Sequence, residues 1–447
     1  MLFSTRLVWH LRARAGETMW NAVKRCVKIA KLSLLWLRRI LFAPNHFDVN
    51  FFTKLRMNIC GGYLADQYVL YDFKHNDRRE YLSEFDWYRS RWINEPFDQM
   101  YNNKIICSEV LSRYITVPEN LLMKNKGKIV SLCSDSADGY RTYGDVIKAL
   151  SDEGALFMKP IAAGKGKDVF RLEKADGGIV VDGDLLTETE FVSFLESKDA
   201  WFLSKAVKQH PFLDEIYDKT TNTMRVITLR DPSTGTYKVF FAVLRIGTHE
   251  TIPVDNGSRG GLVAMIDLET GELSEARSLH ALGASQVHPD SGYQIQGAVV
   301  PDWPEVKDEI LSLARRFPFA PFTAWDVLLT SQGVCIIEAN TSSGVNIIQL
   351  WGPQKDNELG DFYRFHKVGH NYAAHDTPLY SRPFLTTNTK YSRNVFAIEH
   401  LGVILYGFRD SLQRSYRMAF EEADGGITAV CRNIFRSSMA RRFSNGR

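Results

Sequence analysis

The stretch that decides the fold reads Trp325-Asp326-Val327-Leu328-Leu329, then Ser331-Gln332-Gly333, then Val334-Cys335-Ile336-Ile337-Glu338-Ala339-Asn340. Two apolar runs separated by a short turn predict two antiparallel strands joined as a hairpin. Asp326 is expected to start the first strand and Glu338 and Asn340 to end the second, so the pairing brings all three to one end of the hairpin. Glu338 and Asn340 are two residues apart, and their side chains therefore point to the same face.

Metal ligation is the chemistry that these three side chains indicate. The oxygens of Asp326, Glu338 and Asn340 are hard ligands of the kind that Mg²⁺ takes, usually together with the phosphates of a substrate. Mn²⁺ is the alternative ion. The competing interpretation is that the residues only cap strands and form turns, where Asp and Asn are common. A Glu that closes an Ile-Ile run is less usual there, so the pattern favours a metal site.

Two lobes of mixed helix and strand surround the hairpin and predict an α+β fold. The large lobe, residues 211–350, is expected to hold strands at 225–229, 237–245, 262–268, 323–330 and 334–339, and a helix at about 305–316. The small lobe, residues 151–210, is expected to hold strands at 156–159, 169–172, 179–181 and 200–206, and a helix at 187–196 that Thr187 caps through Glu190.

Three flanking regions complete the predicted organisation, since 447 residues are too many for one ordinary core. Residues 1–45 form a basic amphipathic segment, and residues 46–150 form a mixed, mostly helical region. Residues 351–447 form a polar, irregular C-terminal extension with a basic tail.

Three weaker patterns lie outside the hairpin. Lys159 precedes the loop Gly164-Lys165-Gly166-Lys167, whose glycines would let backbone N–H groups approach phosphates, although a plain turn explains the loop nearly as well. Arg225, at the end of Asn222-Thr223-Met224-Arg225, and Arg245 on the next strand can clamp a carboxylate or a phosphoryl group, although a structural ion pair is the simpler explanation. The polar loop 254–261 fits a binding loop and a plain turn equally well.

Together these patterns resemble the ATP-grasp superfamily, and more specifically its sugar-transfer-associated branch, which is found beside enzymes of polysaccharide biosynthesis. The resemblance covers roughly residues 120–350. Its matches, in order, are residues 222–225, 245–247, Asp255-Asn256 with Gly260-Gly261, 266–273, His288-Pro289, Gly297, 301–303, 325–327 and 337–340. It implies an ATP-grasp fold in which two α+β lobes clamp ATP, preceded by a mostly helical N-terminal region.

The resemblance implies roles around the phosphates of ATP. Lys159 would contact the side of the α-phosphate, and the loop of Gly164, Lys165 and Gly166 would close over the phosphates. Arg225, with Arg245 beside it, would contact the γ-phosphate or the acyl phosphate that develops from it. One or two Mg²⁺ ions would lie on Asp326, Glu338 and Asn340.

The resemblance also implies an adenine slot along the strand at 203–207, lined by its backbone, with Lys205 and Val207 in contact with the nucleotide. Asn222 is expected among the nucleotide contacts too. Many members place acidic residues in this linker, whereas this sequence has Ser204-Lys205. The ribose contact therefore departs from the usual pattern, and Gln209 or Asp214 are the substitutes that the chain offers.

The activity implied by the resemblance is that of a ligase, which uses ATP to phosphorylate a carboxylate and then joins it to an amine or a hydroxyl of a small molecule or glycan precursor. Such chemistry requires no protein nucleophile, and the sequence shows no Ser–His or Cys–His signature. Two alternatives stay open: an ATP-dependent kinase of a sugar or lipid-linked sugar, and a non-catalytic nucleotide-binding module of a membrane glycan assembly.

Charge is unevenly distributed along the chain. Residues 1–45 carry +8, residues 431–447 carry +5 and the remainder carries −10. Basic ends on an acidic body point to an anionic surface and away from nucleic acid. Residues 20–43 predict a basic amphipathic helix, too charged to span a bilayer, that lies either in a membrane interface or on its own domain. With six scattered cysteines, we expect reduced thiols in a cytoplasmic protein, peripheral at the inner membrane face.

Overall fold

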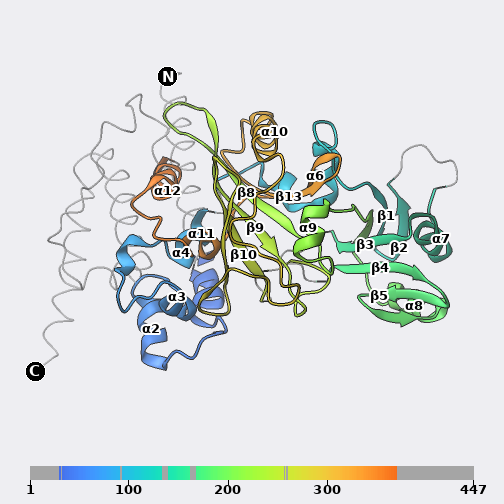
Figure 1. Ribbon diagram of the computed structural model, residues 1–447, viewed down its shortest axis with the longest axis horizontal. Helices are drawn as coiled ribbons and strands as arrows, with labels where there is room; N and C mark the ends of the chain where they lie inside the picture. Colours follow the sequence, from blue (N-terminus) through green and yellow to red (C-terminus); the bar gives the residue numbers. More distant parts are fainter. Residues whose placement is uncertain are drawn as a thin grey trace, which may run out of the picture. The chain divides into compact units, whose positions relative to one another are not determined.

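The computed structural model describes residues 30–31, 33–90, 93–132, 139–161, 168–255, 257 and 260–369, and the chain divides into two compact units (Figure 1). The first unit, residues 1–65 with 377–447, contains the π-helical turn η1 (Leu37–Leu41) and helix α2 (Phe51–Ile59). The helix expected at 20–43 is described only from residue 30, and residues 30–31 and 33–41 are helical there. Among the described residues, every helix is too short or too polar to cross a lipid bilayer.

The second unit, residues 66–376, begins with the short helices that were expected in this region. They are α3 (Ala65–Leu70), the 3₁₀ turn η2 (Arg78–Glu80), α4 (Glu84–Ser90), α5 (Asp98–Asn102) and α6 (Lys104–Leu111). Asn103 caps α6, because its Oδ1 accepts hydrogen bonds from the N–H groups of Ile105 and Ile106, both at 3.1 Å. This cap fixes the direction in which the first residue of α6, Lys104, leaves the helix.

The first sheet of this unit has seven antiparallel strands in the order β2-β1-β7-β3-β4-β5-β6. They are β1 (Asn120–Asn125), β2 (Lys128–Ser131), β3 (Ala155–Pro160), β4 (Phe170–Ala175), β5 (Gly178–Val181), β6 (Asp184–Leu186) and β7 (Trp201–Lys205). Helices α7 (Tyr143–Glu153) and α8 (Glu188–Glu196) pack on this sheet and share its core (Figure 1). The expected cap of α8 is present, since Thr187 Oγ1 accepts from Glu190 N at 3.3 Å and the Glu190 carboxylate accepts from Thr187 N at 2.9 Å.

This sheet begins earlier in the chain than residue 151, the expected start of the small lobe. Strand β1 pairs with β7, so β1, β2 and α7 belong to the sheet and its core rather than to the preceding helical region. The physical reason is that the apolar run of β1, Leu121-Leu122-Met123, is short and followed by polar residues. Such a run carries little periodic signal, and its pairing with β7, some 80 residues later, is what joins β1 and its neighbour β2 to this sheet.

The second sheet also has seven antiparallel strands, in the order β12-β11-β10-β9-β8-β13-β14. They are β8 (Thr223–Arg230), β9 (Tyr237–Ile246), β10 (Leu262–Ile266), β11 (Leu273–Ser278), β12 (Ala284–Ser285), β13 (Phe322–Thr330) and β14 (Gly333–Asn340). The predicted hairpin is confirmed as β13 and β14. Strands β11 and β12 were not foreseen, because β11 carries Glu275 and Arg277 and β12 is only two residues long.

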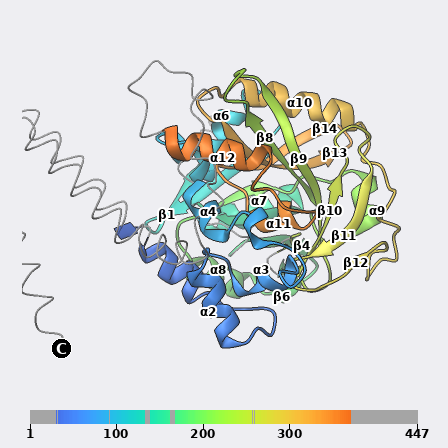
Figure 2. The same ribbon diagram turned by 90° about the vertical axis from the view of Figure 1, so that its left-hand side faces the viewer.

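Helices cover both faces of this second sheet. On one face, α9 (Pro211–Ile216) and α10 (Trp303–Arg315) contribute to the largest hydrophobic core. On the other face, α4, α11 (Val345–Gln349) and α12 (Glu358–Gly369) close a second core, and Figure 2 looks onto this side. The region after residue 351 was expected to be irregular, and α12 shows that this expectation was wrong for residues 358–369. Leu359, Phe362 and Tyr363 recur at helical spacing and bury one face of α12.

Asn222, which was expected to contact the nucleotide, is instead a fully buried link between β8 and its neighbours. Its Oδ1 accepts hydrogen bonds from Thr220 Oγ1 at 2.8 Å and from Gly247 N at 3.0 Å. Its Nδ2 donates to the carbonyls of Leu213 and Tyr217, at 3.2 and 2.7 Å. Every polar atom of the side chain thus has a protein partner, and the expected nucleotide contact does not fit this position.

Replacing Asn222 by Ala should therefore lower the stability of the protein and have little direct effect on nucleotide affinity. The substitution leaves the buried N–H of Gly247 without its partner and removes the closer of two donors from the carbonyl of Tyr217, so the free energy of unfolding should fall by roughly 2–4 kcal/mol. Denaturant unfolding of the variant measures this loss. Asn102→Ala, at an exposed position on α5, is the control and should change stability by less than about 0.5 kcal/mol. An Asn222→Ala protein of normal stability and weak ATP binding would return this residue to the nucleotide site.

Candidate active site

A row of charged side chains crosses three neighbouring strands of the second sheet. Asp326 of β13 lies directly opposite Glu338 of β14 on one side and Arg225 of β8 on the other. Residues opposite each other in antiparallel strands project from the same face, with Cβ atoms about 4.5–5.5 Å apart. The hairpin therefore brings Asp326 and Glu338 together as expected. Asp326 is the fifth residue of β13 rather than its first, because the strand extends back to Phe322.

Further along β8 and β13, the sheet face that carries this row is apolar. Side chains at alternate positions of a strand share a face. Those that share the face of Arg225 and Asp326 are Ile227 and Leu229 on β8 and Ala324 and Phe322 on β13, and all four lie in the core closed by α4, α11 and α12. The charged row is therefore the polar end of a face whose other end is packed core.

Arg225 holds the carboxylate of Asp326 with two of its nitrogens. Nε donates to Oδ1 at 2.5 Å and Nη2 donates to Oδ2 at 3.1 Å, and both side chains are largely buried. The remaining nitrogen, Nη1, lies 3.4 Å from Oγ of Ser343, in the segment that follows β14. This two-point contact fixes the plane of the guanidinium as well as its position.

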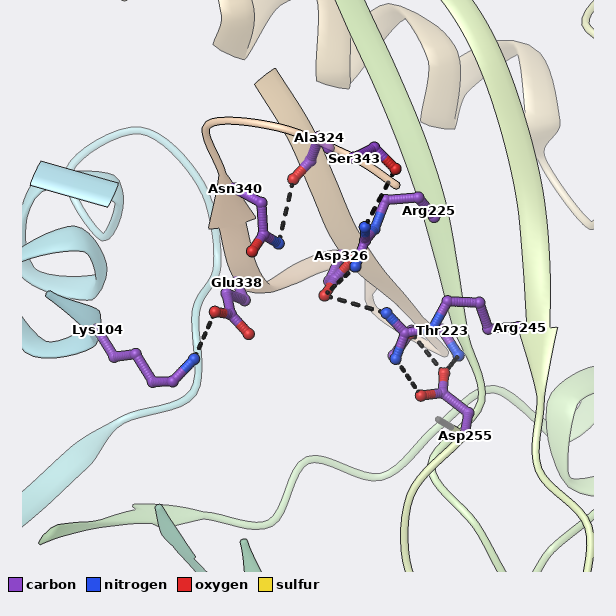
Figure 3. A network of polar contacts seen from close by, with 10 residues as sticks. All are labelled: Lys104, Thr223, Arg225, Arg245, Asp255, Ala324, Asp326, Glu338, Asn340 and Ser343. Atoms are coloured by element: carbon purple, nitrogen blue, oxygen red, sulfur yellow. Dashed lines mark hydrogen bonds and ion pairs between the residues drawn. The ribbon is translucent and has the colours of Figure 1, made fainter. Parts of the chain in front are cut away.

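Arg245 of β9 links Asp326 to a second buried carboxylate, that of Asp255 (Figure 3). Nη1 of Arg245 donates to Oδ2 of Asp326 at 3.2 Å, while Nη2 contacts Oδ1 of Asp255. Asp255 is in turn anchored to the start of β8, because its Oδ2 accepts from Thr223 N at 2.7 Å and from Thr223 Oγ1 at 2.5 Å. Two acids and two arginines therefore alternate in one buried chain of ion pairs.

The two arginines keep Asp326 ionised. Burial alone raises the pKa of a carboxyl, but Arg225 and Arg245 outweigh burial and hold the pKa of Asp326 below its ordinary value. The charge of this network is therefore set by contacts inside the protein and stays negative on Asp326 at neutral pH.

Glu338 and Asn340 are less completely engaged than Asp326. Oε1 of Glu338 contacts Nζ of Lys104, and Nδ2 of Asn340 donates weakly to the carbonyl of Ala324 at 3.5 Å. Within the described part of the chain, Oε2 of Glu338 and Oδ1 of Asn340 have no hydrogen-bond partner. Figure 3 shows both side chains on β14, on the same side as Asp326.

These oxygens fit a magnesium ion. Two carboxylates and one amide supply hard donors, and two of the donor oxygens are free of protein partners among the described residues. Asp326 would reach the ion only by sharing its oxygens with the two arginines. Three acidic, histidine or cysteine ligands do not gather anywhere in the described residues. A site made of Asp326, Glu338 and Asn340 would therefore complete its coordination with groups from a ligand, as Mg²⁺ sites commonly do.

Lys159, near the end of β3, is a partly buried cation that has no ion-pair or hydrogen-bond partner among the described residues. No carboxylate or carbonyl among the described residues accepts a hydrogen bond from its Nζ, which lies 5.5 Å from the ring centroid of Phe157. Burial and the nearby ammonium of Lys104 lower the pKa of Lys159 to about 8. An anion that binds next to this buried ammonium would stabilise its charged form more than it would stabilise the ammonium of an exposed lysine.

The other predicted nucleotide contacts lie in different settings. Gly164, Lys165 and Gly166 fall outside the described residues. Lys205 forms ion pairs with Glu153 at 2.8 Å and Glu119 at 2.9 Å, and these bonds raise its pKa. Its side chain would have to leave both partners to reach a nucleotide.

The linker after β7 offers backbone groups rather than side chains. Val207 makes no hydrogen bond to another described residue through its backbone, so its N–H and C=O remain available to a ligand. Gln209, a suggested ribose contact, is buried and donates through Nε2 to Asp214 at 2.9 Å and to the Thr220 carbonyl at 3.0 Å. It is therefore occupied by the fold.

Sequence reasoning missed two charged members of the site. Lys104, which contacts Glu338, lies 234 positions away in the chain at the start of a short helix, where nothing in the local sequence marks it. Asp255 lies in the glycine-rich loop that was noted without a role, and its signal was an acid ten residues after Arg245. Ser343, next to Arg225, follows directly on the Asn340 end of the hairpin.

Comparison with known proteins gives this geometry a family. Residues 88–356 match a protein family that is described as sugar-transfer associated ATP-grasp. Curated proteins yield no match. Solved structures that are similar include the ATP-grasp ligase PsnB complexed with minimal precursor, at 13% identity and TM-score 0.34, covering 62% of this chain and 63% of that chain. D-alanyl-alanine synthetase A from Vibrio cholerae O1 biovar eltor str. N16961 is another, at 13% identity and TM-score 0.36, covering 62% and 66%.

The chain thus spans less than two thirds of the length of these two structures. The family match, by contrast, covers more than half of the 447 residues and contains the whole charged row with its hairpin. This protein belongs to the sugar-transfer associated ATP-grasp family.

Proposed function

We propose that this protein is an ATP- and Mg²⁺-dependent ligase, which activates a carboxylate as an acyl phosphate and joins it to an amine or a hydroxyl. The observation that carries the proposal is the register of the hairpin, which sets Asp326 opposite Glu338 with Asn340 two residues further along the same face. Family membership supports ATP as the nucleotide. The donor oxygens beside two guanidinium groups support phosphoryl transfer at this end of the sheet.

The charge balance of the site favours an anionic ligand. Its cations are Lys104, Lys159, Arg225 and Arg245, and its carboxylates are those of Asp255, Asp326 and Glu338. The surplus positive charge resides on Lys159, the one member of this set without a described partner. ATP carries several negative charges. Its phosphates would bind next to Lys159 and offset the free energy that burial of this ammonium costs.

Magnesium would be held by Asp326, Oε2 of Glu338 and Oδ1 of Asn340, and it supplies charge neutralisation for the transferring phosphoryl group when it is bound. Lys104 already lies against Glu338, so an ion there would free its ammonium to donate to a phosphate oxygen. Val207 would offer its backbone N–H and C=O to the adenine. The loop of Gly164, Lys165 and Gly166 would cover the phosphates.

The two steps of the reaction balance without a protein nucleophile. A carboxylate oxygen of the substrate attacks the γ-phosphorus as the bond to ADP breaks, which gives an acyl phosphate. The amine or hydroxyl then attacks the carbonyl carbon, phosphate leaves, and the nucleophile loses its proton. Arg225 and Arg245 would stabilise charge on the phosphoryl oxygens, since Asp326 and Asp255 hold their guanidinium planes in place.

The substrate and setting are proposed on the same basis. The association of the family with sugar transfer supports a glycan precursor as the substrate. The charge of +8 on residues 1–45 supports a cytoplasmic enzyme that attaches peripherally to the inner membrane face.

Product analysis tests the reaction class. Incubation of the protein with ATP, Mg²⁺ and carboxylate-bearing glycan precursors, in the presence of an amine or alcohol, should yield an amide or ester together with ADP and free phosphate, detected by mass spectrometry. A stable phosphoester without free phosphate would identify a kinase instead. Nucleotide binding without any turnover across the precursor panel would favour a non-catalytic module.

Substitution of Glu338 by Gln tests the metal assignment. The amide keeps the shape of the side chain but removes its charge, so turnover should fall at least about a hundredfold and half-maximal activity should need more Mg²⁺. Glu188→Gln is the matched control, because Glu188, on helix α8, is also paired with a lysine, Lys174, and neither residue belongs to the proposed site. A Glu338→Gln enzyme with near-normal turnover would remove Glu338 from the metal site.

The pH dependence of ATP affinity tests Lys159. A bound phosphate favours the charged ammonium, so affinity should be constant below the free pKa of about 8 and fall as pH rises above it. Calorimetry should show binding about tenfold weaker at pH 9 than at pH 7. Lys159→Arg stays charged and should lose this step while retaining affinity, whereas Lys159→Ala should bind roughly ten to a hundred times more weakly at pH 7. An identical pH profile in the wild type and the Arg variant would exclude Lys159.

A further inference from the structure

The most exposed apolar side chains of the described chain gather in one short segment of the first unit. Phe52 is 80% exposed, Phe42 74%, Phe51 68% and Leu34 66%, and no other large apolar side chain in the described residues exceeds these values. All four lie between residues 34 and 52. Single exposed apolar residues are ordinary on protein surfaces, but a cluster of this kind marks an interaction site.

The local fold presents the aromatic rings outward. Oδ1 of Asn50 accepts from Thr53 N at 2.9 Å, so Phe51 and Phe52 are the first two residues of α2. Met57 and Asn58 bury the inner side of this helix, and Phe52 lies with Arg56, one turn later, on the outer side. The two Phe rings meet edge to face, with centroids 5.8 Å apart.

A hydrogen bond joins the preceding segment to this helix. Nζ of Lys54 donates to the carbonyl of Ala43 at 2.9 Å, which ties the residue after Phe42 to the first turn of α2. Phe42 therefore lies in the segment that is tied to the start of α2, and we name the three exposed side chains Phe42, Phe51 and Phe52 the aromatic tip.

The charges around the aromatic tip are almost all positive. Residues 30–60 contain five Lys and Arg and a single acid, Asp48. Lys31, Arg38, Arg39 and Arg56 are exposed. Cations that surround exposed aromatic rings complement a surface that is apolar inside and anionic outside, which describes the headgroup region of an anionic lipid bilayer.

We propose that the aromatic tip inserts into the surface of an anionic lipid bilayer, with the rings of Phe42, Phe51 and Phe52 below the headgroups and the surrounding Lys and Arg side chains among them. This proposal rests on the peripheral membrane attachment proposed above. In this proposal, the apolar contact with the bilayer includes α2 as well as residues 20–43. It also explains why α2 begins with two exposed phenylalanines, which an isolated soluble helix has no need of.

The test is co-sedimentation of the full chain with vesicles. Wild-type protein should pellet with vesicles of phosphatidylserine and phosphatidylcholine and much less with phosphatidylcholine alone. The double substitution Phe51→Ser/Phe52→Ser should lower the partition coefficient about tenfold or more, because two ring insertions are lost while the net charge is unchanged. The control Leu282→Ser/Val299→Ser removes two exposed apolar side chains from the second unit, 65% and 53% exposed, and should bind like the wild type.

The outcomes separate the aromatic tip from the wider attachment. If the wild type does not bind anionic vesicles, both the proposed membrane attachment and the proposed role of the aromatic tip are wrong. If the wild type binds and the Phe51→Ser/Phe52→Ser protein binds equally, the tip is wrong while attachment through the basic segment stands. Pelleting of the wild type without vesicles, abolished by the double substitution, would identify the tip as a contact between copies of the chain. Circular dichroism and ATP turnover of the double variant, both expected to be normal, confirm that it is folded.

Discussion

The site depends on one buried carboxylate, that of Asp326, held between two arginines. Removing a charge from water is expensive unless its partners are close and well oriented, and a buried charge that loses its partner is strongly destabilising. Arg225 comes from β8, which pairs with β13, Arg245 comes from β9, the next strand beyond β8, and Asp255 extends the network to a loop. The alignment of β8, β9 and β13 and the position of that loop are therefore coupled to a single electrostatic arrangement.

Around this saturated centre, the site keeps some groups open. Both oxygens of Asp326 have partners, whereas Glu338 and Asn340 each retain an oxygen without one in the described chain. Lysines show the same division: Lys205 is held by two glutamates, while Lys159 has no carboxylate partner in the described part of the chain and has a lowered pKa. The paired side chains of Asp326, Arg225 and Arg245 fix the geometry. The groups without a described partner lie beside them, and this is the arrangement that electrostatic preorganisation requires.

The two units of the chain differ in the surfaces they expose. The second unit carries the two sheets and the charged row, with its polar groups largely paired inside the fold. The described part of the first unit is short, basic and rich in exposed aromatic rings. The proposed attachment through the first unit would raise the local concentration of the protein at a surface where its proposed substrates gather.

Local chemistry in the sequence was sufficient for the hairpin, for the cap of α8 and for five of the seven strands of the second sheet, because turn residues, capping pairs and apolar runs act over a few positions. The family resemblance likewise followed from the sequence. Tertiary structure alone decided which polar side chains are free. Asn222 looks like a binding residue in the sequence, but four partners drawn from Leu213, Tyr217, Thr220 and Gly247 occupy it. Lys104 has no local signal, yet it reaches Glu338 across 234 positions. Whether a side chain is available to a ligand depends on partners that only folding brings near, and spacing along the chain does not contain that information.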